Sequence, residues 1–171
     1  MSVIRPCRDD ERAAVHAIIN RAAVAYRGVI PADCWHDPYM TMQELQSEAA
    51  GGVAFWGYES DGMLVGVMGI QPVRDVDLIR HAYVLPGAQR HGVGAALIGH
   101  LRASSTRRML VGTWADAAWA IRFYRRYGFE LVSTERKTTL LETYWTISAR
   151  QREVSVVLAS PPLTGAGSID R

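Results

Sequence analysis

The segment from Tyr83 to Leu97 constrains the fold of this chain more than any other, because it reads as a strand that passes through a glycine-bearing turn into a helix. The start of a helix leaves backbone N–H groups unpaired and carries partial positive charge. Gly92 and Gly94 let a ligand approach this backbone, and Arg90 and His91 can add charge-assisted hydrogen bonds. The segment therefore predicts a phosphate-binding turn. Its inward helix face is predicted to carry Val93, Ala96, Leu97 and Leu101.

Three other interpretations of this turn are weaker. An ordinary glycine-rich connection between a strand and a helix would need neither Gln89 nor Pro86, so the presence of both residues disfavours that interpretation. A dinucleotide-binding fingerprint lacks its third glycine, since Leu97 stands there, and a triphosphate loop lacks the Lys-Ser or Lys-Thr pair. A phosphate-binding turn of another kind remains.

A second informative segment runs from Ala117 to Phe129. Its helical periodicity places four residues on one face, namely Ala120, Phe123, Tyr124 and Tyr127. Gly128 is placed to end the helix in the left-handed conformation. Taken alone, this pattern favours a core tyrosine at position 124.

Together, Gln89-x-x-Gly92-x-Gly94 after Val84-x-Pro86 and the later Tyr-x-x-Tyr-Gly-Phe segment resemble the GNAT (GCN-related) N-acetyltransferase superfamily. The resemblance covers roughly residues 53–135. It implies that acetyl-coenzyme A (acetyl-CoA) is the co-substrate, that Tyr124 protonates the departing thiolate and that the Val84 amide polarises the acyl carbonyl. The cofactor-binding residues that it implies are Ala82, Val84, Gln89, Arg90, His91, Gly92, Val93, Gly94 and Ala95. One departure is Ala117, where many members have an asparagine, and Asp116 or Thr113 is expected to cap the helix instead.

The order of predicted elements indicates the fold class. We expect helices within 9–26 and 41–50, and strands at 53–58, 64–72, 76–84, 109–114, 129–134 and 153–159. This order predicts an α/β (α+β) fold with a mixed sheet and helices on both faces. The resemblance implies the GNAT acyl-CoA N-acyltransferase fold, with a mostly antiparallel sheet whose middle strands splay near Val84 and Trp114. We expect one domain, residues 1–160, and a mobile tail, residues 161–171.

Acetyl transfer also needs a base for the acceptor amine, and Asp77, His81 and Glu59 are the candidates. We favour His81 because the pKa of a histidine suits this task, although a structural histidine in the sheet is the simpler interpretation. Strand alternation places Arg80 and His81 on opposite faces unless a bulge intervenes. If Arg80 faces the site, it is available to an acidic group of the substrate.

Aromatic residues gather in two regions that both border the acceptor cleft in this fold. They are Tyr26, Trp35 and Tyr39 in the early loop, and Trp119, Tyr144 and Trp145 later in the chain. Such a cleft suits a small amine or a ring, although tryptophans also serve as core anchors and dimer contacts. The segment 140–145 either covers the cleft or forms a subunit contact.

Composition argues against several other classes of function. The net charge of +2 and the scattered basic residues argue against a nucleic-acid partner. The two cysteines, Cys7 and Cys34, predict reduced thiols in a cytoplasmic protein, and neither they nor the five histidines have metal-site spacing. No apolar run reaches the ~20 residues of a membrane span.

The resulting prediction is an acetyl-CoA-dependent N-acetyltransferase that acts on a primary amine of a small molecule, or on an exposed protein amine, by direct transfer in a ternary complex. A non-catalytic acyl-CoA-binding regulatory module is the alternative, since it would keep Gln89 to Gly94 without needing Tyr124. The family also makes a homodimer an expectation.

Overall fold

The structure is a computed structural model that describes residues 1–163, and its centre is a seven-stranded sheet. The strand order is β1-β2-β3-β4-β5-β7-β6. The strands are β1 (Ser2–Pro6), β2 (Ala54–Ser60), β3 (Met63–Val73), β4 (Val76–Val84), β5 (Arg108–Trp114), β6 (Glu130–Leu131) and β7 (Ser155–Ser160). Among the strands of residues 1–163, only β4 and β5 pair in parallel. The predicted meander and the mostly antiparallel mixed sheet are confirmed.

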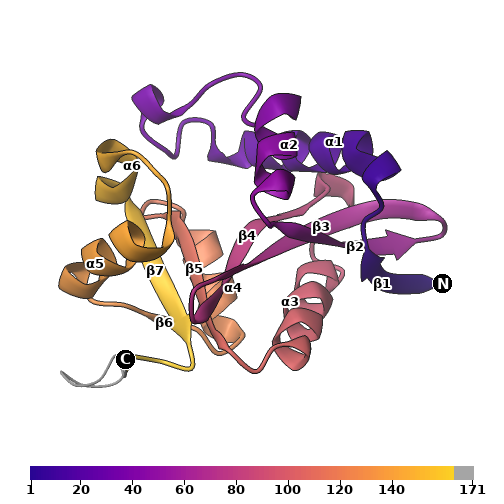
Figure 1. Cartoon of the computed structure of the whole chain (residues 1–171). Helices are drawn as coiled ribbons and strands as arrows, with labels where there is room; N and C mark the ends of the chain where they lie inside the picture. Colours follow the sequence, from indigo (N-terminus) through magenta and orange to yellow (C-terminus); the bar gives the residue numbers. More distant parts are fainter. Residues whose placement is uncertain (164–171) are drawn as a thin grey trace.

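Helices cover both faces of this sheet, as predicted (Figure 1). The helices are α1 (Arg12–Ala23), α2 (Met42–Ala50), α3 (Val93–Ser104), α4 (Ala118–Arg126), α5 (Thr134–Tyr144) and α6 (Ala149–Glu153). One core joins α3 and α4 to a face of the sheet through Leu97, Ile98 and Tyr124. On the opposite face, α1 and α2 pack through Ile19 and Leu45, and α5 packs beside them.

The segment after α4 differs from its prediction. The strand expected at 129–134 is reduced to Glu130–Leu131, and α5 begins at Thr134. The Ser133 hydroxyl accepts a hydrogen bond from the Arg136 N–H and so caps α5, while Leu140 and Leu141 pack on β5 and β7. Leu140 and Leu141 of segment 140–145 thus belong to the core of the domain.

The start of α4 is a second correction. Neither Asp116 nor Thr113 caps this helix: the N-cap is Ala117, and no side chain bonds to the first turn. Ala117 is fully buried, and its backbone carbonyl accepts from the N–H groups of Ala120 and Ile121. Backbone hydrogen bonds, and not a side-chain cap, therefore form the first turn of α4. At the other end, Gly128 is left-handed as predicted, with φ of 91°.

Three further expectations concern the C-terminal tail, the cysteines and membrane-spanning helices. Most of the tail that was expected to be mobile, residues 164–171, lies outside the described residues. Cys7 and Cys34 are both free thiols. Among residues 1–163 no helix is long and apolar enough to cross a membrane.

Candidate active site

A cleft opens where β4 and β5 diverge. The two strands pair only from Val76 to Ile79 against Arg108 to Val111, and β5 then continues beside β7. The Leu85 N–H donates to the Val65 carbonyl at 2.8 Å, so strand alternation turns the Val84 N–H the other way, into the cleft. The end of β4 therefore presents an unpaired backbone edge, as the resemblance implied.

A cavity of about 990 Å³ occupies this cleft and continues between α3, α4 and the loop after α1. Eight of the nine predicted cofactor-binding residues line it, namely Ala82, Val84, Gln89, Arg90, Gly92, Val93, Gly94 and Ala95. His91 is exposed and does not line the cavity. The Gln89 Nε2 donates to the Val84 carbonyl at 3.1 Å, which ties the turn to the end of the strand.

The turn before α3 has the geometry of an anion site. Arg90 and Gly92 have φ of 65° and 79°, and this left-handed backbone turns successive N–H groups to one side. The amides of Val93, Gly94 and Ala95 donate to no residue in 1–163. A Cβ at Gly92 would meet no atom within 4 Å, so the space beside the turn is open to a ligand.

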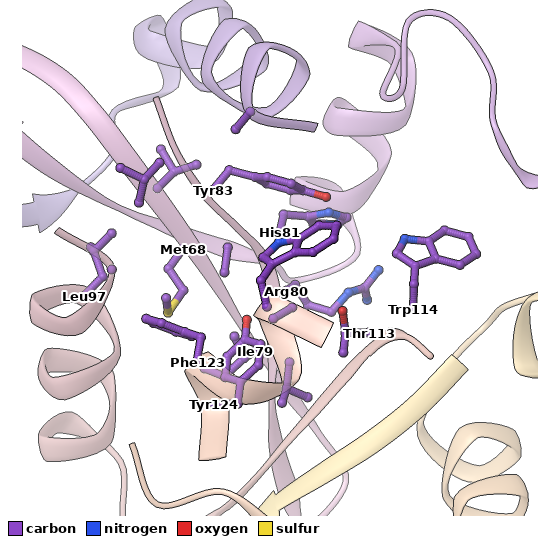
Figure 2. Close-up of a pocket in the computed structure, with 18 of the residues that line it drawn as sticks. Met68, Ile79, Arg80, His81, Tyr83, Leu97, Thr113, Trp114, Phe123 and Tyr124 are labelled. Carbon is purple, nitrogen blue, oxygen red and sulfur yellow. The ribbon is translucent and has the colours of Figure 1, made fainter. Parts of the chain in front are cut away.

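Tyr124 reaches the same cavity from α4 (Figure 2). Its ring is 6% exposed and packs edge-on against Phe123 and Phe129, with centroids 5.1 and 5.6 Å away. Its hydroxyl has no hydrogen-bond partner among residues 1–163 and points into the cavity. Burial raises the pKa of Tyr124 well above that of a free tyrosine, so the group carries its proton at neutral pH.

A bulge in β4 decides the placement of Arg80 and His81. Val67 pairs with Tyr83 and Gly69 with Arg80, so His81 and Ala82 together oppose one residue of β3. His81 has a left-handed φ of 51°. Because of this bulge, Arg80 and His81 both line the cavity, instead of pointing to opposite faces as simple alternation would require.

Glu48 of α2, which the sequence did not point to, holds both of these residues. Its carboxylate lies 2.9 Å from the Arg80 guanidinium and 3.5 Å from the His81 Nε2, and this Nε2 has no hydrogen-bond partner among residues 1–163. Arg80 also donates to the Gln71 side-chain oxygen at 2.8 Å. Burial is the main cause that lowers the pKa of His81, so its ring is neutral at pH 7 and able to accept a proton.

The other two candidate bases lie outside the cavity wall. Asp77 accepts hydrogen bonds from Ser105 at 2.5 Å and from Arg107 at 3.2 Å. Glu59 lies 2.6 Å from Arg5. Both carboxylates serve structural pairs, so among the three candidates only His81 faces the cavity.

Aromatic rings form the end of the cavity away from the α3 turn. Tyr26 lies 5.2 Å from Trp119 between ring centroids, and Tyr39 lies 6.4 Å from Tyr83. The Trp114 Nε1 donates to the Tyr39 hydroxyl at 3.1 Å. Two of the predicted aromatic residues do not line the cavity: Trp35 packs behind Tyr39, and Tyr144 bonds to Asp75. Trp145 does line it, beside Gly112.

Comparison with known proteins agrees with this geometry. Residues 51–131, which include β4, the α3 turn and α4, match the family model of the acetyltransferase (GNAT) domain. No curated protein sequence is significantly similar to the chain.

Solved structures are similar over nearly the whole length. The ribosomal-protein-S18-alanine N-acetyltransferase of Escherichia coli is 19% identical with a TM-score of 0.68, covering 98% of this chain and 99% of that one. The PaiA N-acetyltransferase of Thermoplasma acidophilum, in complex with coenzyme A, is 12% identical with a TM-score of 0.68 (93% and 98% covered). The ribosomal-protein-alanine N-acetyltransferase of Brucella melitensis is 22% identical with a TM-score of 0.59 (92% and 97%). The chain therefore has the fold of the solved GNAT N-acetyltransferases, and its residues 51–131 match the acetyltransferase (GNAT) domain.

Proposed function

We propose that this chain transfers the acetyl group of acetyl-CoA to a primary amine of a small molecule, or to an exposed protein amine, by direct transfer in a ternary complex. One observation carries the proposal. A single cavity joins the unpaired amides of the α3 turn, the free edge of β4 and the Tyr124 hydroxyl. These are the groups that a pyrophosphate, a pantetheine arm and a departing thiolate require.

The α3 turn fits the pyrophosphate. Free N–H groups at Val93, Gly94 and Ala95, the open space at Gly92 and the charge of Arg90 favour an anion there. His91 lies on the solvent side of this turn and is proposed as an additional phosphate contact. The E. coli and Brucella proteins act, by their names, on an alanine of a ribosomal protein, and the Thermoplasma protein holds coenzyme A, which supports the same chemistry here.

Acetyl-CoA supplies an acetyl group activated as a thioester. The Ala82 and Val84 N–H groups are proposed to bind the arm and the acyl carbonyl, where negative charge develops as the amine attacks. The new N–C bond forms as the C–S bond breaks. Tyr124 gives its proton to the sulfur, and the proton leaving the amine passes to neutral His81, directly or through a water molecule.

Two measurements test this proposal. Acetyl-CoA binding is measured by calorimetry, and thiol release is followed with a panel of amines. Gly92→Leu fills the open space and forces a branched side chain into a left-handed backbone, so we expect it to lose acetyl-CoA binding.

Gly99→Ala is the matched control, since it lies further along the same helix where a Cβ meets nothing within 4 Å. It should bind acetyl-CoA as the parent does, with a slightly raised melting temperature. Undiminished binding by a folded Gly92→Leu variant would remove the pyrophosphate assignment, and no acetyl-CoA binding by the parent protein would overturn the proposed function.

A further inference from the structure

The charge of the cavity wall restricts the acceptor. Among the described residues that line the cavity there is no aspartate and no glutamate. The formally charged side chains in the wall are Arg80, Arg90 and Arg126. An amine that carries two or more positive charges would therefore lose its hydration at this wall without meeting an anion.

The phenols of the wall do not supply negative charge either. Burial raises the pKa of Tyr26 to about 12 and that of Tyr83 well above its usual value, so both hydroxyls stay neutral. The Glu48 carboxylate, which contacts Arg80 and His81, does not line the cavity and is already paired with Arg80. This pair also leaves Arg80 without unmatched charge, so the site has no evident receptor for an acidic group on the acceptor.

The shape and the apolar character of the acceptor end suit an aromatic group. Five rings face this part of the cavity, those of Tyr26, Tyr39, Tyr83, Trp114 and Trp119. Tyr83 and Trp114 flank the region beside His81 and Thr113 in Figure 2. Trp119 is 39% exposed and lies at the rim, in contact with Tyr26. Offset and edge-on stacking on these rings would hold a flat apolar ligand.

The two observations together name a substrate class. We propose that the acceptor is a primary amine with a single positive charge, borne on a short chain that ends in an aromatic ring, and that polyamines, aminoglycosides and lysine-rich peptides are poor acceptors. This inference rests on the proposed function.

The test compares kcat/KM for phenylethylamine and tryptamine with kcat/KM for spermidine, kanamycin and a lysine peptide, using the full chain and saturating acetyl-CoA. We expect the aromatic amines to exceed the polycations by at least a hundredfold. If none is turned over, binding of phenylethylamine and of spermidine to the protein saturated with coenzyme A is measured by calorimetry, and phenylethylamine should bind more tightly.

Variants at two positions separate stacking from charge. Trp119→Leu should raise KM for tryptamine about tenfold with acetyl-CoA affinity unchanged, while Trp119→Phe keeps a ring and should stay close to the parent. Gln151 lines the cavity from α6, and Gln151→Glu adds a carboxylate of nearly the same shape. This variant should shift the preference toward spermidine by about tenfold.

Faster turnover or tighter binding of polycations by the parent protein would overturn the inference and leave the proposed function standing. Equal KM values in the parent and Trp119→Leu would overturn the stacking argument, and an unchanged preference in Gln151→Glu would overturn the charge argument. Failure of acetyl-CoA to bind would instead remove the proposed function itself.

Discussion

Gly69→Ala is the most direct test of the bulge that places Arg80 and His81 on the cavity wall. Gly69 pairs with Arg80 across β3 and β4. A Cβ at Gly69 would lie 2.8 Å from the Arg80 carbonyl oxygen and 2.8 Å from a methyl carbon of Val53, whereas ordinary contact begins at 3.4 Å. The strands must therefore separate by about 0.6 Å at the bulge, because a backbone carbonyl cannot rotate away as a side chain can.

The size of the effect follows from this displacement. Overpacking of a core costs about 1–3 kcal/mol, and for a chain of this length about 2 kcal/mol lowers the melting temperature by roughly 4–8 °C. Since a misplacement of ~1 Å at a catalytic group can cost about a hundredfold in rate, we expect kcat to fall about tenfold. Thermal unfolding and thiol release are the measurements.

Gly57→Ala is the matched control in the neighbouring strand β2. A Cβ there lies 2.5 Å from the Cδ2 of Leu64 and 3.0 Å from the Cys7 sulfur, both of which are side-chain atoms. Leu64 can change rotamer, so kcat should stay close to that of the parent. A Gly69→Ala variant with the stability and the turnover of the parent would refute the claim that the bulge depends on this close approach.

Two further predictions concern the proposed catalytic groups. Tyr124→Phe should lower kcat about 10²–10³-fold at unchanged acetyl-CoA affinity and melting temperature, because the hydroxyl has no hydrogen-bond partner among residues 1–163. Equal turnover of the variant and the parent would reject the role of Tyr124 as the acid. Burial lowers the pKa of His81, so His81 binds a proton more readily in the unfolded chain than in the folded one. The free energy of unfolding should therefore decrease as the pH falls below about 6.5, the usual pKa of histidine. The decrease should level off once His81 is protonated in the folded chain as well. His81→Gln should flatten that part of the pH profile in chemical denaturation, and an unchanged profile would show that His81 does not titrate in this way.

Local features of the sequence predicted most of the fold and the left-handed turn that is proposed to bind the cofactor. The β2–β4 meander follows from the alternation of apolar and polar residues along each strand, and the α3 turn follows from a helix start next to glycines that tolerate a left-handed backbone. Both signals lie among neighbouring residues of the sequence. The strand expected at 129–134 failed for a related reason. An apolar run followed by a serine fits both a strand and a capped helix. The packing of Leu140 and Leu141 on β5 and β7 stabilises the helix, α5.

The sequence by itself determined the family motifs, the left-handed turn before α3 and the position of Tyr124 on α4, since each lies within one short segment. Only the tertiary structure decided which side chains meet at the acceptor end. Glu48 reaches Arg80 and His81 from a helix more than thirty residues away, and the bulge brings those two residues to one wall. The acid-free, aromatic lining likewise combines the loop after α1 with β4, β5 and α4, a juxtaposition that no local pattern encodes because it arises from packing between distant segments.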